Sequence, residues 1–210
     1  MIYEFCAENF TLIEKAMEAG ARRIELCDNL AVGGTTPSYG VTKAAVELAA
    51  NYETTIMTMI RPRGGDFVYT NQEVAIMLDD IRLTAQAGSQ GVVFGALTAD
   101  NKLDKFNLEK LIAASNGMEI VFHMAFDELS DQDQLEAIDW LSQAGVKRIL
   151  TRAGVSGDSL EKRFSRYQRL LDYATGKIEI LPGGGIDMAN RQEFIDRLGV
   201  NQLHGTKVVF

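Results

Sequence analysis

Two short segments with the same pattern decide the fold: Ile-Tyr-Glu-Phe-Cys at residues 2–6 and Arg-Ile-Glu-Leu-Cys at residues 23–27. Each alternates apolar and polar side chains, which is typical of a β-strand whose two faces meet different surroundings. The apolar side chains of both segments suit a layer beneath helices. The glutamates and cysteines then share the opposite face, which becomes the interior if the sheet closes into a barrel.

Strand-like and amphipathic segments alternate along the whole chain. The strand-like runs are residues 2–6, 23–27, 55–61, 91–95, 119–123, 148–151, 178–181 and 202–204. The amphipathic segments predict helices over residues 12–19, 42–50, 72–87, 108–114, 134–144, 160–174 and 191–198. Helix start signals lie at Asn71, Ser130 and Asp187, and helix stop signals at Gly20, Gly88, Gly145 and Gly199.

The number of βα units favours a closed sheet. Eight units predict an α/β fold of the (β/α)₈ TIM-barrel type, with residues 1–210 as a single domain. A doubly wound open sheet is the alternative, but its glycine-rich phosphate turn should follow the first strand, where this chain has Cys6-Ala-Glu-Asn9. The chain ends six residues after His204, so we expect the eighth helix to be short or missing. A second copy of the chain would then cover the last strand, which predicts a homodimer or higher homo-oligomer.

Composition excludes several classes of partner. Lys and Arg number 21 against 29 Asp and Glu, a net charge of −8, and no run of basic residues is present. Nucleic acid and anionic membrane surfaces are therefore not expected partners. No apolar stretch of about 18 residues is found, so no membrane span is expected either. With only two cysteines the chain is no disulfide scaffold, and we expect a cytoplasmic protein with free thiols.

Polar residues gather where the predicted strands end. Arg61, His123 and His204 each end a strand, and TIM barrels keep their sites at this C-terminal mouth. Glycine runs after strands let the backbone approach a ligand and aim N–H groups at an anion. The candidates for substrate binding are therefore Arg61, Arg63, Gly183, Gly184, Gly185 and His204. The candidates for catalysis by proton transfer are Glu25, His123 and Asp127. The inward Glu4 and Glu25 need cationic partners, and we expect Arg61 or Arg63 to supply them.

Four longer strings resemble one family. They are Glu25-Leu-Cys27 with Gly34-Thr-Thr-Pro37, Met59-Ile-Arg-Pro-Arg-Gly-Gly-Asp-Phe67, Val93-Phe-Gly-Ala-Leu-Thr98 and Pro182-Gly-Gly-Gly-Ile186. In this order they resemble the CutC family, named for copper homeostasis, and the resemblance runs from Met1 to about His204. It implies a cytosolic, often oligomeric (β/α)₈ barrel with copper, as Cu(I), bound by cysteines that match Cys6 and Cys27. The chain departs from the family pattern at Met124, where an arginine is common, and at Arg152-Ala153, where a Ser-Gly pair is common.

The two cysteines also have a direct physical interpretation. Neighbouring strands lie about 4.8 Å apart, so Cys6 and Cys27 could place two thiolates on one soft ion. A buried free cysteine that packs as a small hydrophobic side chain is the commoner case. Three functions stay open: a copper homeostasis protein that binds Cu(I) at the barrel mouth, an enzyme of unknown reaction acting on a small anionic or sugar-like substrate, and an oligomeric scaffold.

Overall fold

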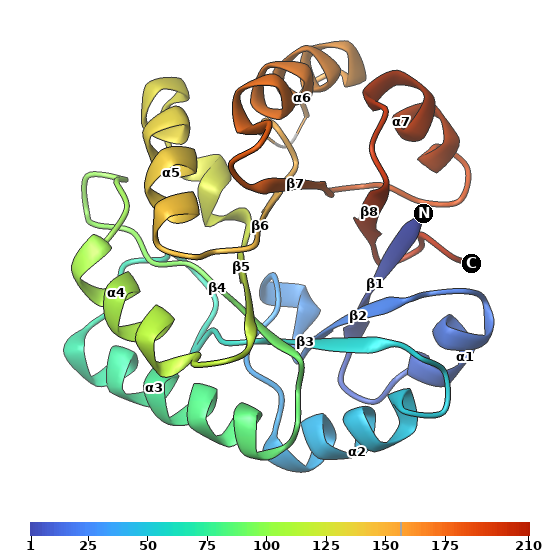
Figure 1. Ribbon diagram of the computed structural model, residues 1–210, viewed down its shortest axis with the longest axis vertical. Coiled ribbons are helices and arrows are strands. Elements are labelled where there is room, and N and C mark those ends of the chain that lie inside the picture. Colours follow the sequence, from blue (N-terminus) through green and yellow to red (C-terminus); the bar gives the residue numbers. More distant parts are fainter. Residues whose placement is uncertain (156) are drawn as a thin grey trace.

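The computed structural model describes residues 1–155 and 157–210. Along these residues eight parallel strands alternate with seven α-helices, and the helices form an outer ring around a TIM-type (β/α)₈ barrel (Figure 1). The strands are β1 Ile2–Glu8, β2 Arg23–Cys27, β3 Thr55–Met59, β4 Gly91–Phe94, β5 Glu119–Phe122, β6 Arg148–Thr151, β7 Glu179–Pro182 and β8 Gln202–Gly205. The α-helices are α1 Ile13–Glu18, α2 Tyr39–Ala49, α3 Asn71–Gln86, α4 Lys105–Ala114, α5 Asp131–Gln143, α6 Leu160–Ala174 and α7 Arg191–Leu198. Two short 3₁₀ helices follow strand ends, η1 Leu30–Val32 and η2 Met124–Glu128.

The alternation of side chains sorts the residues into two cores. Apolar side chains that point outward, such as Phe5, Ile24 and Leu26, join the large core beneath the helices. A second, smaller core fills the barrel interior and consists of Cys6, Cys27, Met57, Met59, Val93, Val121, Leu150 and Leu181. The prediction that both cysteines point inward is confirmed. Side chains alternate strictly between the two faces of a strand, so the sequence pattern fixes the face on which each one lies.

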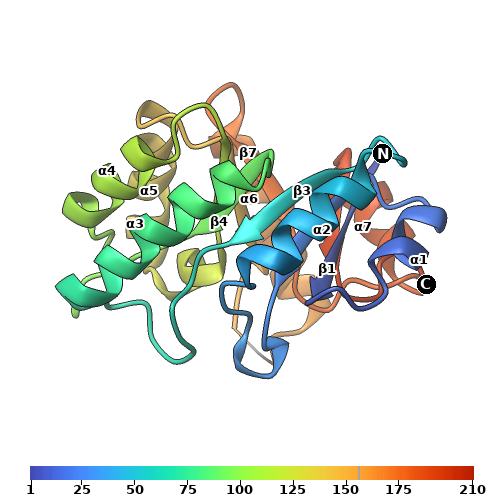
Figure 2. The ribbon, with the colours of Figure 1, turned by 90° about the horizontal axis from the view of Figure 1, so that it is seen from below.

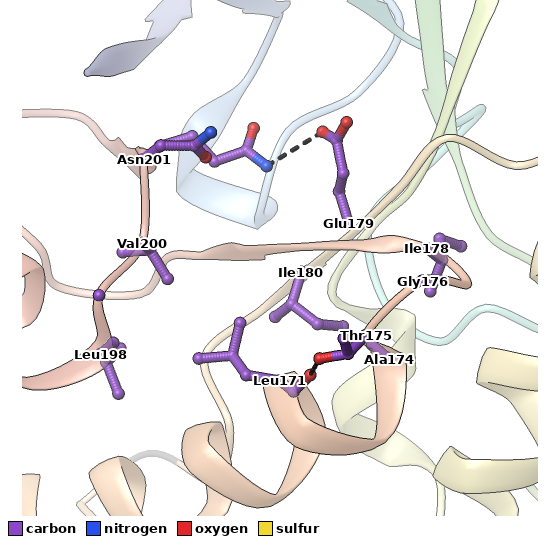
Figure 3. A pocket seen from close by; sticks show the side chains of 12 residues that line it. Leu171, Ala174, Thr175, Gly176, Ile178, Glu179, Ile180, Leu198, Val200 and Asn201 are labelled. Atoms are coloured by element: carbon purple, nitrogen blue, oxygen red, sulfur yellow. Dashed lines mark hydrogen bonds between the residues drawn. The ribbon is translucent and has the colours of Figure 1, made fainter.

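The sheet nearly closes on itself. Its strand order is β7-β6-β5-β4-β3-β2-β1-β8, and the doubly wound order considered above is wrong. At the seam between β7 and β8, the side-chain amide Nε2 of Gln202 donates to Glu179 Oε2 at 3.1 Å, and this bond is drawn in Figure 3. Side chains of α6 and of the segment before β8 line a groove of about 340 Å³ beside the seam (Figure 3).

The last residues of the chain take the place of an eighth helix. No helix follows β8 in the described part of the chain, and the two termini lie between α7 and α1 (Figure 1). Val208 and Val209 are buried, and the ring of Phe210 lies 5.2 Å from that of Phe5. The expected second copy is therefore not needed to cover the last strand, so that argument for an oligomer was wrong. The oligomeric state itself stays a prediction.

Several helices begin earlier than their apolar pattern indicates. Helices α2, α4 and α5 each start three residues before the predicted position, since their first turns precede the repeating apolar pattern on which the prediction rested. The Ser130 cap is confirmed, since its hydroxyl accepts from the N–H of Asp133 at 3.2 Å. Thr70, rather than Asn71, caps α3, and Asn190, rather than Asp187, precedes α7.

The four predicted glycine stops all have left-handed backbone, with φ between 62° and 98°. Within the described residues, no helix combines the length and the apolar character that crossing a bilayer requires.

Candidate functional site

A cavity opens at the C-terminal mouth of the barrel. The loops after β2 and β3 project at this end (Figure 2). The cavity has a volume of about 200 Å³. Its lining consists of Cys6, Glu25, Leu30, Gly33, Met59, Arg61, Phe67, His123, Met124, Leu150, His204 and Thr206. Five of the predicted site residues, from five different strands or strand ends, thus meet in one place.

Two sulfur atoms and one carboxyl group form the deepest part of this site. Cys6 pairs with Glu25 in the register of β1 and β2, so both side chains stand at the same level. Glu25 Oε2 lies 3.2 Å from Cys6 Sγ and 3.6 Å from Cys27 Sγ. One ligand atom from each of these three residues lies within 4.8 Å of the other two. Cys27 is buried behind the cavity wall and does not line it.

A buried ion network lies below the sulfur atoms. Glu4 pairs with the Arg23 guanidinium, and its Oε1 lies 2.8 Å from His204 Nδ1. The other ring nitrogen of His204, Nε2, is 3.6 Å from Glu25 Oε2. The sequence analysis missed Arg23 as a residue of this network. Residues 23, 25 and 27 share one face of β2, so the alternation of side chains could have shown that Arg23 points inward with Glu25 and Cys27.

Charges in this network shift the protonation of both cysteines. Hydrogen bonding from Cys27, aided by the neighbouring His204, outweighs burial and lowers the pKa of Cys6 to about 5. The same contact with Cys6, together with burial, raises the pKa of Cys27 well above its usual value. Burial raises the pKa of Glu25, whereas the carboxyl groups and Cys6 around His204 overcome burial and raise its pKa. The pair therefore loses its first proton more readily than an ordinary thiol does and its second less readily.

The pH dependence of alkylation tests this assignment. Because the Cys6 pKa is lowered to about 5, its thiolate fraction is complete from about pH 6 upward, whereas an ordinary thiol gains thiolate up to about pH 9. We expect the rate of iodoacetamide modification of Cys6, followed by peptide mass spectrometry, to be flat from about pH 6 to 8. A rate that rises about tenfold per pH unit over this range would contradict the assignment.

Neither predicted arginine partner pairs with the inward glutamates. Arg61 donates to the carbonyl oxygens of Val32 and Gly34 at 2.8 and 3.1 Å and to that of Gly65 at 2.7 Å. Arg63 lies outside the cavity and pairs with Glu73 at 2.5 Å and with Asp66 at 3.0 Å. The expectation that they neutralise the inward glutamates was wrong, because both side chains organise the loops after β2 and β3 instead.

His123 stands on the cavity wall in a fixed orientation. Its Nδ1 accepts from the backbone N–H of Ala125 at 3.2 Å. A Cβ at position 95 would come within 2.7 Å of Nδ1 and Cε1, so only glycine leaves room for this ring. Burial, helped by the charge of Arg61, lowers the pKa of His123 to about 3. The imidazole is therefore neutral.

The remaining candidates lie beside the cavity. Asp127 accepts from Thr151 Oγ1 at 2.5 Å and from the backbone N–H of Arg152 at 3.0 Å, which ties η2 to the end of β6. It lines an adjoining cavity of about 410 Å³ together with Arg61, Met124 and Arg152. At the position where the family pattern has an arginine, Met124 Sδ lies 3.8 Å from the Arg152 guanidinium, so a positive charge still stands at this rim.

The glycine run after β7 lines neither of these two cavities. The guanidinium of Arg163 donates to the carbonyl oxygens of Gly183 and Gly184 at 2.8 Å each. A Cβ on Gly184 would lie 2.6 Å from Arg152 Cβ, and one on Gly183 would lie 2.8 Å from Leu150 Cδ1. These two glycines thus allow close packing behind the site, and Gly185 accepts from Asn190 Nδ2 at 2.9 Å.

Comparisons with known proteins agree on one family. A family model described as the CutC family matches residues 1–209. A CutC family protein from Enterococcus faecalis is 51% identical over 209 residues and covers 100% of both chains. A human protein named copper homeostasis protein cutC homolog is 38% identical over 203 residues, which are 97% of this chain and 72% of the human one. The crystal structure of a CutC protein from Streptococcus agalactiae superposes with a TM-score of 0.95 at 42% identity, over 99% of each chain.

Proposed function

The chain belongs to the CutC family, and on this basis we propose that it serves copper homeostasis by binding Cu(I) between Cys6 and Cys27. The observation that carries the proposal is the pair of buried sulfur atoms that share one carboxyl oxygen at 3.2 and 3.6 Å. Cu(I) is a soft ion that prefers few ligands and sulfur above all. The donor set therefore fits this ion better than it fits a hard cation such as Mg²⁺, which takes oxygen ligands.

The surroundings of the sulfur atoms support transport or storage of a reactive ion. Cys6 and Cys27 are 7% and 1% exposed, so water and dissolved oxidants have little access. The lowered pKa of Cys6 favours its thiolate, and Cys27 would release its proton as the ion binds. Glu25, whose Oε2 lies 3.6 Å from Cys27 Sγ, is placed to pass on that proton.

A metal titration tests the proposal. Under anaerobic and reducing conditions, we expect the purified protein to bind one Cu(I) or Ag(I) ion per chain in competition with a chromogenic chelator. Mn²⁺ and Mg²⁺, which prefer oxygen ligands, should not displace it at equal concentration. No stoichiometric uptake of either soft ion, with both thiols reduced, would refute the proposal.

A second candidate function, an enzyme acting on a small anionic or sugar-like substrate, is supported by a separate observation. Glu25, Arg61 and His123 all line the same cavity, and each has one buried polar atom without a partner among the described residues. Such atoms are costly unless a ligand or water satisfies them. In this function Glu25 and His123 would transfer protons, and Arg61 would attract the substrate.

We further propose a cytosolic location and a homodimer or higher homo-oligomer, both as properties of this family. Light scattering in solution, which gives the mass of the assembly directly, tests the oligomer. A monomer mass would contradict it.

A further inference from the structure

His123 lines the mouth cavity and carries a buried hydrogen-bond donor that has no partner among the described residues. Because its Nδ1 accepts from the N–H of Ala125, the single proton of the neutral ring lies on Nε2. The edge formed by Nδ1 and Cε1 packs against Gly95, and the ring is part of the cavity lining. His123 is 3% exposed, and its Nε2 has no partner among the described residues.

Arg61 adds a positive charge to the same wall. It is 4% exposed, and among the described residues no carboxylate lies within 4.0 Å of its guanidinium. Its partners are three carbonyl oxygens and the ring of Phe67, whose centroid lies 4.9 Å from Cζ. A buried cation that is met only by neutral groups favours an anion close by.

The size and the walls of the cavity limit what the anion can carry. A volume of about 200 Å³ corresponds to roughly seven water molecules at about 30 Å³ each. Apolar side chains supply much of the lining, namely Leu30, Met59, Phe67, Met124 and Leu150. A ligand that fills this space therefore has a few carbon atoms in addition to its charged group.

We propose that the mouth cavity binds a short-chain carboxylate, whose oxygen accepts from His123 Nε2–H beside Arg61 and whose carbon chain packs on the apolar wall. This inference deepens the second candidate function by naming the class of its ligand. It requires neither copper nor Cys27, so its failure and the failure of Cu(I) binding are distinguishable.

Ligand titrations of the whole, copper-free protein test the inference. Butyrate, the neutral butyramide and inorganic phosphate are titrated to about 10 mM, and the imidazole resonances of ¹⁵N-labelled His123 are followed by NMR. We expect butyrate to shift the Nε2–H resonance and to bind at least about tenfold more tightly than butyramide, because only the carboxylate is an anion. We expect phosphate, which lacks the carbon chain, to bind more weakly than butyrate as well.

Matched variants locate the binding. His123→Phe keeps a ring of similar shape but lacks the donor, and should weaken butyrate at least about tenfold. Arg82→Gln, an exposed change on α3, should leave the affinity unchanged. Equal binding of butyrate and butyramide, phosphate binding as tight as butyrate, full affinity in His123→Phe, or no shift of the His123 resonances would each overturn the inference. The resonances of the unmodified protein decide the question even if the variant does not fold.

Discussion

Replacing Cys6 and Cys27 together by serine is expected to weaken Cu(I) binding at least about a thousandfold, which corresponds to about 4 kcal/mol. In the proposed site the two cysteine sulfur atoms are the soft ligands, and a serine hydroxyl is a poor ligand for Cu(I). The Glu25 carboxyl that remains between them is a hard ligand. Competition with a chelator of known Cu(I) affinity measures the loss.

Two further variants test whether the loss of Cu(I) is due to the cysteine sulfur atoms. Met59→Leu removes a neighbouring sulfur from the same cavity while conserving volume, and it should keep Cu(I) affinity within about threefold. Cys6→Ala with Cys27→Ala avoids the buried hydroxyls and should lose the ion as the serine variant does. Retention of tight, stoichiometric binding by either double variant in a folded state would contradict the role of the cysteines.

Replacing Arg23 by methionine is expected to destabilise the fold by about 3–5 kcal/mol, because it leaves the buried Glu4 carboxylate without its main partner. Arg23 is 5% and Glu4 1% exposed, so water cannot replace the lost contact. Unfolding in urea at neutral pH measures the change in the free energy of unfolding. Arg82→Gln, which breaks an exposed pair with Asp79, should change it by less than about 1 kcal/mol.

The effect of Arg23→Met should fade in acid. Although burial acts in the opposite direction, Arg23 and His204 lower the pKa of Glu4 to about 2 from an ordinary 4.5. The stability contributed by ionised Glu4 is therefore present above about pH 4.5 and is lost as the pH falls towards 2. The unmodified protein and the Arg23→Met variant should therefore approach equal stability as the pH nears 2. A difference that stays constant between pH 7 and 3 would show that the ion pair is not its cause.

Strand parity was the reliable source of prediction from the sequence. It placed the apolar side chains of both opening segments beneath the helices, and it placed Cys6, Glu25 and Cys27 inside the barrel. Successive side chains of a strand alternate between the two faces of the sheet, so fixing the face of one residue fixes the face of all the others. The mouth could also be predicted, since parallel strands all end on the same side and bring Arg61 and His123 together.

Partner choice could not be predicted in the same way. A long, flexible arginine side chain can reach many acceptors, so sequence alone did not show that Arg61 would bind loop carbonyls while Arg23 neutralised Glu4. Val208, Val209 and Phe210 cover the last strand, but this segment is too short to show the hydrophobic periodicity of a helix or a strand, so its packing could not be predicted. The start of α2 was missed because its capping residue, Ser38, was not recognised in the sequence as a helix start signal.

The local environment of the bound ion tests the proposed copper site most directly. X-ray absorption spectroscopy at the copper edge, on the protein loaded with one equivalent of Cu(I), reports which elements contact the metal. We predict two sulfur neighbours in the unmodified protein and none in the Cys6→Ser, Cys27→Ser variant. A first coordination shell of nitrogen and oxygen alone, or a spectrum that the double substitution leaves unchanged, would place copper elsewhere and contradict the account.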